Sequence, residues 1–222
     1  MNNYHIKTLE EYFKVYRASV ENPEQFWGDL AEEHFIWRKK WNKVLSWDFS
    51  KPEIKWFEGA KLNITENCID RHLITRGDKT AILFEPNDPN EAAQHITYKE
   101  LHERVNQFSN VLKSQGISKG DRVCIYLPMI PELAISVLAC ARIGAIHSVV
   151  FAGFSAKSLA DRVNDADCNI VLTSDGSYRG EKSIELKAIV DEALETCRTV
   201  KRVIVLKRTG EDVNMLAGRD VW

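Results

Sequence analysis

The 222-residue sequence lacks the features of several protein classes. No apolar run comes near the roughly 20 residues that a membrane-spanning helix needs. The opening residues, MNNYHIKTLEEYF, do not place a basic stretch before an apolar one, as a secretory signal would. The five cysteines are odd in number and widely spaced, which favours reduced core thiols over disulfides or a zinc site. We therefore predict a cytoplasmic protein with no membrane partner and no metal site.

An excess of charge of one sign is also missing. The 30 basic and 32 acidic residues leave a formal net charge of −2, so the chain has no electrostatic footprint for nucleic acid. Catalytic motifs are scarce: the sequence has no HxH or HExxH spacing, no GxSxG elbow and no GxxxxGKS/T phosphate loop. The chain does contain 44% hydrophobic and 28% charged residues, which suit a folded core. The residues themselves identify no catalytic group.

Residues 1–60 are predicted to form a helical extension dense in aromatic and charged side chains. In NPEQFWGDLAEEHF, a helix is expected to begin at Pro23, with Asn22 as its cap and Gln25 as the capping-box partner. Residues 47–59, WDFSKPEIKWFEG, are predicted to be irregular, because their proline and glycine interrupt regular elements. The tryptophans of the extension have two possible roles: they would line an aromatic site for a ligand, or they would anchor the extension against the rest of its own domain. Their spread over several elements favours anchoring.

Residues 61–222 are predicted to alternate between strands and helices. The expected elements are a helix at 63–77, strands at 79–86 and 94–98, a helix at 97–116, a strand at 121–128, a helix at 130–144, a strand at 145–151, a helix at 155–167, a strand at 168–175, a helix at 183–197 and a strand at 201–208. Strands that are apolar throughout and separated by helices indicate a parallel sheet covered on both faces. The predicted fold is α/β, a doubly wound, mostly parallel sheet after a helical arm.

Three loops follow strands at the edge where ligands bind in such sheets, outside the carboxyl ends of the strands. They are residues 127–132 (LPMIPE), 151–156 (FAGFSA) and 174–183 (SDGSYRGEKS). In FAGFSA, Ala152 and Gly153 would let a ligand approach the backbone, while the helix that follows would offer free amides to an anion. A tight strand-to-helix turn would need the same glycine, and the spacing alone favours the turn.

The loop YRGEKS presents two basic side chains around a glycine. Arg179 and Lys182 would give one phosphate a guanidinium fork and an ammonium group. A solvent-exposed turn that binds no ligand would contain the same types of residue. The residues by themselves leave both interpretations open.

Several longer motifs together resemble those of one family. WFEGAKLN, YLPMIPE, FAGFSAKSLADR, RGEK and the closing GRDVW are similar to the first third of the AMP-forming acetate–CoA ligases, the acetyl-CoA synthetases. The resemblance implies a reaction in which acetate and ATP form acetyl-adenylate with Mg²⁺, after which coenzyme A takes the acetyl group and AMP leaves. It also implies that the ATP-binding loop follows the last residue, so the chain is expected to be an inactive N-terminal fragment with no tightly bound cofactor.

The same resemblance implies a coenzyme A site. Its RGxK-like tetrad falls on Arg179, Gly180, Glu181 and Lys182, with the basic side chains near the 3′-phosphate. A second contact is expected at Gly153, with weaker ones at Phe151 and Ala152. No catalytic residue is assigned.

Other interpretations remain open. A propionyl- or other short-chain acyl-CoA synthetase would share these motifs, because the acyl pocket is expected beyond residue 222. A non-catalytic nucleotide-binding or interaction module would fit the missing catalytic motifs. We also expect the fragment to self-associate through apolar surface that a longer enzyme would cover.

Overall fold

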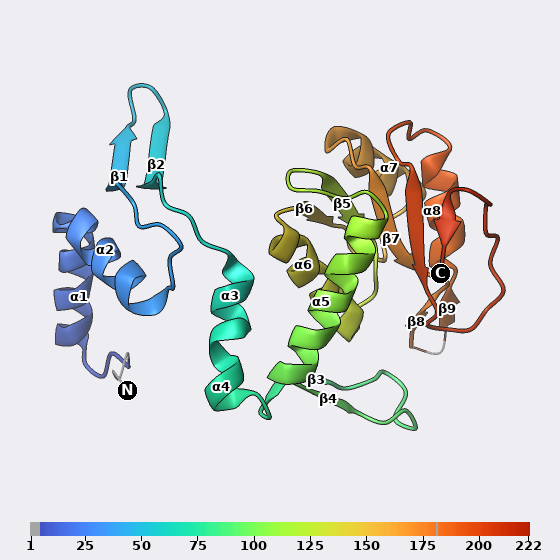
Figure 1. Ribbon diagram of the computed structural model, residues 1–222, viewed down its shortest axis with the longest axis horizontal. Helices are drawn as coiled ribbons and strands as arrows, with labels where there is room; N and C mark the ends of the chain where they lie inside the picture. Colours follow the sequence, from blue (N-terminus) through green and yellow to red (C-terminus); the bar gives the residue numbers. More distant parts are fainter. Residues whose placement is uncertain (1–4, 181) are drawn as a thin grey trace. The chain divides into compact units, whose positions relative to one another are not determined.

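The computed structural model describes residues 5–180 and 182–222, whose elements are shown in Figure 1. By its contacts the chain divides into two compact units, Met1–Asn67 and Cys68–Trp222, whereas the sequence predicted a division after residue 60. Asn67 is tied to the first unit, because its amide accepts from the Ile36 N–H at 2.7 Å and donates to the Ile36 carbonyl at 3.1 Å.

Two helices open the first unit. Helix α1 spans Leu9–Glu21, and helix α2 spans Pro23–His34 and so begins at Pro23 as predicted. The predicted capping box of α2 is absent, because the Gln25 amide donates to the Asp29 carboxylate at 2.7 Å and the N-cap side chain makes no bond to the helix.

A β-hairpin follows the helices, so the first 60 residues are not wholly helical. Strands β1 (Lys43–Asp48) and β2 (Glu53–Glu58) pair antiparallel. The prediction of irregular chain here is wrong, because Pro52 lies in the turn and the glycine lies beyond β2, so neither interrupts a strand. The turn is closed locally: the Asp48 carboxylate accepts from the Ser50 N–H at 2.9 Å and from its hydroxyl at 2.6 Å.

A cluster of partly buried aromatic side chains lies in the first unit. The Trp37 ring lies 5.2 Å from that of Trp41 and 5.5 Å from that of Phe57, measured between centroids. Its indole N–H donates to the Ala31 carbonyl at 2.9 Å, which gives the buried polar tip a partner. These rings therefore pack on one another, and their anchoring against the second unit stays a prediction.

The helix predicted over residues 63–77 is broken into three pieces. These are α3 (Ile64–Cys68), the 3-10 turn η1 (Asp70–His72) and α4 (Leu73–Arg76). The break falls at Ile69, whose backbone angles of φ −123° and ψ −65° leave the helical region. Its side chain is completely buried in the core, so burial of this apolar group accompanies the bend that the capping pattern could not predict.

The next elements follow the prediction closely. Strands β3 (Thr80–Phe84) and β4 (Gln94–Thr97) pair antiparallel, and helix α5 (Tyr98–Ser114) follows. The capping box is complete, since the Glu100 N–H donates to the Thr97 hydroxyl at 3.2 Å and the Thr97 N–H donates to the Glu100 carboxylate at 2.8 Å.

A five-stranded parallel sheet, in the order β11-β10-β7-β5-β6, forms the centre of the second unit. Its strands are β5 (Arg122–Ile125), β6 (Ile146–Val149), β7 (Ile170–Ser174), β10 (Arg202–Leu206) and β11 (Asp220–Val221). The connecting helices are α6 (Pro131–Ile143), α7 (Ala156–Asp165) and α8 (Leu186–Leu194). The short strand β11 was not predicted.

Side chains of the interior strand β5 alternate between two apolar layers. Val123 and Ile125 pack with α5 and α6, whereas Cys124 and the following Tyr126 pack with α7 and α8. Helices therefore cover both faces, as Figure 1 shows. The predicted α/β class and parallel sheet are confirmed.

Candidate functional site

The basic loop of the sequence is a small antiparallel hairpin. Strands β8 (Ser177–Arg179) and β9 (Lys182–Ile184) precede helix α8, so the prediction of a turn leading directly into the helix is wrong. Arg179 and Lys182 are directly paired across the hairpin. Directly paired side chains leave a hairpin on the same face. The structure thus brings together the two basic residues that the sequence singled out.

The turn between the two strands requires a special backbone conformation. Gly180 has φ +62°, in the left-handed region that favours glycine. Apart from its two chain neighbours, no described residue has an atom within 4 Å of where its Cβ would stand. Glu181, the third member of the predicted tetrad, lies outside the described residues.

The charges of the basic pair are not neutralised within the described part of the chain. Both Arg179 and Lys182 are exposed, and neither forms an ion pair with any residue in 5–180 or 182–222. An exposed guanidinium beside an exposed ammonium group offers several donors to a phosphate, and no carboxylate among residues 5–180 and 182–222 pairs with either of them. The arrangement is chemically suited to an anion.

A buried carboxylate fixes the start of this region. Asp175 follows β7, is completely buried and accepts from the N–H groups of Gly176 (2.7 Å), Arg208 (2.7 Å), Thr209 (3.0 Å) and Gly210 (2.8 Å). Burial by itself raises the pKa of Asp175, but these donors outweigh it and lower the pKa. The ionised side chain therefore holds the loop after β10 against the root of the hairpin.

A cleft of about 450 Å³ runs beside the hairpin. It is lined by residues 84–87, 128–130 and 177–180 together with Arg208. The structure thus joins the predicted loop 127–132 to the predicted basic loop. Its volume falls within the range of small-molecule sites, about 300–1,000 Å³.

The loop after β6 is built differently and does not line this cleft. The Tyr126 hydroxyl donates to the Phe154 carbonyl at 2.7 Å, which holds the turn against the sheet. The ring of Phe151 is 65% exposed, and a Cβ on Gly153 would stand 2.5 Å from a carbon of that ring. Ala152 is partly buried. A role for this loop in ligand binding stays a prediction.

Three residues beside the basic hairpin were missed by the sequence interpretation. Asn87 and Glu91 lie in the loop between β3 and β4, and Arg208 follows β10. They line a second polar cavity of about 770 Å³. No local pattern marks them, since the contact between Glu91 and Arg208 joins residues 117 positions apart.

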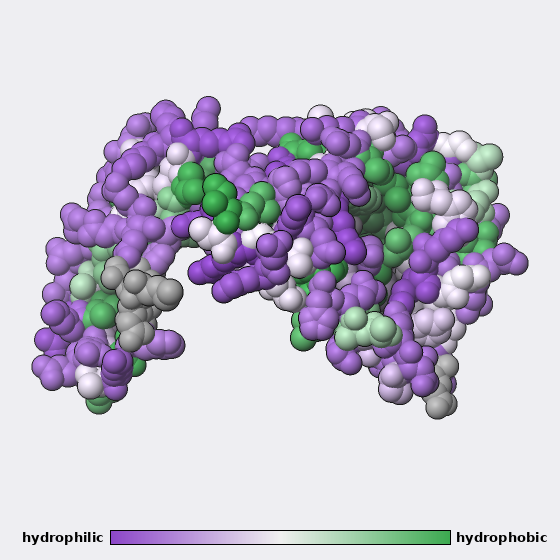
Figure 2. All heavy atoms as spheres, turned by 60° about the horizontal axis from the view of Figure 1, so that its bottom comes forward, coloured by the Kyte–Doolittle hydropathy of each residue, from purple (hydrophilic) through white to green (hydrophobic). Residues whose placement is uncertain are grey.

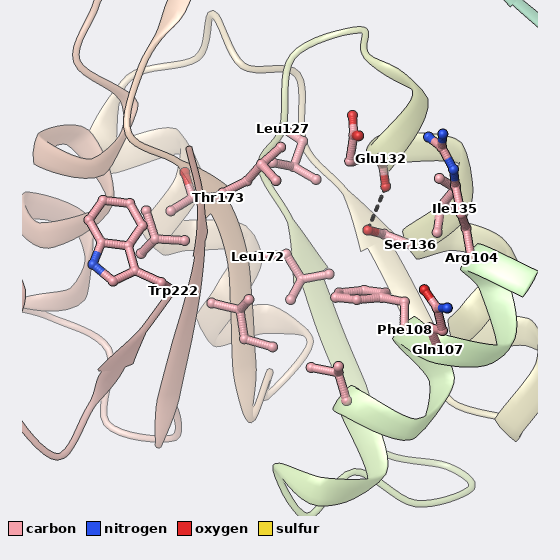
Figure 3. A pocket seen from close by; sticks show the side chains of 14 residues that line it. Arg104, Gln107, Phe108, Leu127, Glu132, Ile135, Ser136, Leu172, Thr173 and Trp222 are labelled. Atoms are coloured by element: carbon pink, nitrogen blue, oxygen red, sulfur yellow. Dashed lines mark hydrogen bonds between the residues drawn. The ribbon is translucent and has the colours of Figure 1, made fainter. Parts of the chain in front are cut away.

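A third cavity, of about 390 Å³, is apolar (Figure 3). Its lining includes Phe108, Leu127, Ile135, Leu172 and Trp222. The Ser136 hydroxyl already donates to the Glu132 carbonyl at 2.6 Å. This cavity therefore offers apolar contacts more than free polar groups, and it is less suited to a charged nucleotide than the cleft beside the hairpin.

Two further properties concern metals and membranes. Within residues 5–180 and 182–222, no group of three or more His, Cys, Asp or Glu side chains is arranged to hold a metal ion. In the same ranges, no helix has both the length and the apolar character needed to cross a bilayer. No described residue is therefore assigned to the Mg²⁺ that the resemblance implies.

Comparison with known families gives two matches. Residues 69–221 match the family described as AMP-binding enzyme, and residues 12–68 match that described as acetyl-coenzyme A synthetase N-terminus. The first match alone covers more than half of the chain. The chain belongs to the AMP-binding enzyme family.

Individual AMP-binding enzymes are similar over nearly the whole chain. An acetyl-coenzyme A synthetase of Alkalilimnicola ehrlichii is 54% identical over 215 residues, which are 97% of this chain and 33% of the relative. Acetyl-coenzyme A synthetase 2 of Pseudomonas aeruginosa is 53% identical over 213 residues, 96% of this chain and 33% of the relative. The solved acetoacetyl-CoA synthetase from Streptomyces lividans has a TM-score of 0.83 at 29% identity and covers 92% of this chain and 31% of its own.

These matches confirm the resemblance to acetyl-CoA synthetases that the motifs indicated. The chain spans about a third of the length of the curated relatives it matches. Its fold is that of the corresponding part of an AMP-binding enzyme.

Proposed function

We propose that the chain is the N-terminal portion of an AMP-forming acetate–CoA ligase. The complete enzyme would join acetate to coenzyme A through an acetyl-adenylate, with ATP and Mg²⁺ as co-reactants and pyrophosphate and AMP as products. The proposal is supported by relatives more than 50% identical that carry the name acetyl-coenzyme A synthetase. We further propose that the enzyme acts in the cytoplasm.

Within that reaction, the chain is proposed to supply part of the coenzyme A site. The observation that carries this proposal is the pair Arg179 and Lys182, exposed on one face of a hairpin and free of ion pairs within the described ranges. Their donors would hold the 3′-phosphate of coenzyme A. Gly180 supports the pair through its turn, Glu181 completes the tetrad, and Phe151, Ala152 and Gly153 would lie farther along the ligand.

The phosphate assignment is tested by calorimetric titration with coenzyme A and with 3′-dephospho-CoA, on this chain and on the complete protein that contains it. Coenzyme A is expected to bind more tightly, and Arg179→Ala is expected to remove about 10- to 100-fold of that preference. Arg198→Ala is the matched control. Arg198 is exposed and lies between the end of α8 and the start of β10, at the amino ends of the strands rather than their carboxyl ends. An unchanged preference in Arg179→Ala would overturn the assignment.

The chain by itself is proposed to be inactive, because no described residue is assigned to the adenylation step. The test is release of pyrophosphate from acetate and ATP, measured for this chain and for the complete protein. Activity of the isolated chain would contradict the proposal. The relative kcat/KM of the complete protein for acetate and propionate would distinguish an acetate ligase from a propionate ligase.

We also propose that the isolated chain associates with a second copy of itself. Figure 2 shows apolar residues gathered around a hollow on one face. The edge strand β6 adds two exposed apolar side chains, Ile146 (55% exposed) and Val149 (49% exposed), and unpaired sheet edges favour association. Light scattering at high protein concentration tests this, and a monodisperse monomer would overturn it.

A further inference from the structure

Residues distant in the sequence contact the hairpin that carries Arg179 and Lys182. They contact Tyr178, directly before Arg179, and Gly180, directly after it. We propose that Asn87, Glu91 and Arg208 form a brace that positions this basic pair for the 3′-phosphate of coenzyme A. The inference rests on the function proposed above, because it explains how the same phosphate seat keeps its shape.

Arg208 is the centre of the brace. Its guanidinium donates through Nη1 to Glu91 Oε1 and through Nη2 to Glu91 Oε2, each at 2.8 Å. Such a two-bond fork fixes the orientation of both groups as well as their distance. The hydrogen bond lowers the pKa of Glu91 and raises that of Arg208, so the pair stays ionised. The loop between β3 and β4 is thereby joined to the end of β10.

The same guanidinium also contacts the hairpin. Its central carbon lies 5.7 Å from the centroid of the Tyr178 ring, which is within the range of a cation–π contact. Tyr178 directly precedes Arg179 and pairs with Ser183 on the opposite strand. Because successive residues of a strand point to opposite faces, Arg208 supports one face of the hairpin while Arg179 projects from the other.

Asn87 holds the other side of Arg179. Its side-chain amide donates to the Gly180 carbonyl at 3.2 Å. Gly180 occupies the turn in a left-handed conformation. The residues immediately before and after Arg179 are therefore both held by the brace, whereas the Arg179 side chain is left without an ion pair among the described residues.

Arg208 is also close enough to the cleft to suggest a different role, as a direct ligand of the phosphate. The two roles predict opposite effects of Glu91→Gln. If Arg208 binds the phosphate, loss of the neighbouring negative charge should leave anion binding unchanged or strengthen it. If Arg208 and Glu91 are a brace, the same change loosens the hairpin and weakens recognition of the phosphate.

The experiment measures KM for coenzyme A and for 3′-dephospho-CoA in the complete protein that contains this chain. The ratio of the two KM values isolates the contribution of the 3′-phosphate. Glu91→Gln and Asn87→Ala are each expected to reduce this preference about 3- to 10-fold, with kcat and melting temperature nearly unchanged. Glu91→Asp, which keeps the carboxylate, is expected to restore part of it. Glu103→Gln, on the exposed side of α5, is the matched charge control.

A double variant shows whether the brace acts through Arg179. In an Arg179→Ala background, Glu91→Gln should cause a clearly smaller further loss, because one of the two positioned groups is already gone and only Lys182 remains. An equal loss in both backgrounds, or a preference that is unchanged or increased in Glu91→Gln alone, would overturn the brace. If Arg179→Ala itself leaves the preference intact, the proposed phosphate seat fails instead.

Discussion

The basic pair Arg179 and Lys182 and the lysine Lys187 lie within nine residues of one another in the sequence, but their charges are balanced in different ways. Lys187 in α8 is 1% exposed, and its amine contacts the carboxylates of Asp191 at 2.7 Å and Asp220 at 2.9 Å and the Asn214 carbonyl at 2.8 Å. Arg219 also bridges the two carboxylates. By contrast, the basic pair of the hairpin is exposed and forms no ion pair among the residues the structure describes.

The difference separates a charge that shapes the fold from one that is available to a ligand. A buried amine must be paired and hydrogen-bonded, because the cost of removing it from water is several kcal/mol per ion. Lys187 meets that requirement by binding the segment after β10 to α8, which makes its charge unavailable. Arg179 and Lys182 remain in water, so they pay no such cost and can exchange water for a phosphate.

The largest expected effect comes from breaking the buried group. Asp220→Ala removes a completely buried carboxylate and leaves the buried Lys187 amine and the partly exposed Arg219 guanidinium short of one partner. We expect the free energy of unfolding to fall by about 3–5 kcal/mol, measured by urea titration. Asp212→Ala removes an exposed carboxylate from the same segment and should cost less than about 0.5 kcal/mol. Equal losses would contradict a special role for the buried group.

Asp175→Ala is expected to be the next most damaging change. It removes the acceptor of four backbone N–H groups at the root of the hairpin, and buried donors without a partner are costly. The expected loss is about 3 kcal/mol of unfolding free energy. Asp175→Asn keeps one side-chain oxygen as an acceptor, so its free energy of unfolding should fall clearly less than that of the alanine variant. A loss below about 1 kcal/mol for the alanine variant would mean that solvent replaces the carboxylate.

Acid should weaken the buried group without affecting the hairpin pair. Burial raises the pKa of Asp220, but hydrogen bonds from Arg219 and Lys187 outweigh it and lower the pKa from 3.8 to about 2. Because the folded pKa is depressed, the stabilisation is complete above about pH 5 and is lost as the pH falls toward 2, by about 2 kcal/mol in total. The test compares the unfolding free energy of the wild type and Asp220→Asn between about pH 6 and pH 2.5. If the difference in unfolding free energy between the two proteins does not shrink as the pH falls, the predicted loss of stabilisation by Asp220 is wrong.

Local patterns in the sequence predicted the parts of the fold that local contacts create. The helix start at Thr97 and Glu100 needs only residues three positions apart, and the alternation of apolar strands with helices was sufficient for the parallel sheet. The bend at Ile69 was missed because it depends on burial in a core built from other elements. The first hairpin was missed because the position of Pro52 relative to the strands decides its effect.

The candidate site was predictable only in part for the same reason. Arg179 and Lys182 stand beside a glycine, so their proximity could be inferred from the sequence. The residues that hold them could not, because Glu91 and Arg208 meet only after the β3–β4 loop and the end of β10 have been brought together. Asp175 carried a weak indication, a carboxylate directly after an apolar strand, but its four donors come partly from the loop after β10.

The smallest expected effect on stability best tests the contrast between the buried Lys187 and the exposed basic pair of the hairpin. Arg179→Ala and Lys182→Ala each remove an exposed cation, so the free energy of unfolding should change by less than about 0.5 kcal/mol. A slight increase is expected, because like charges paired across two strands repel each other. Urea titration of both variants measures this at low and at high salt, and added salt should abolish any gain. A loss above about 1 kcal/mol would mean that the pair supports the fold, as Lys187 does, and that its charges are not held available for a ligand.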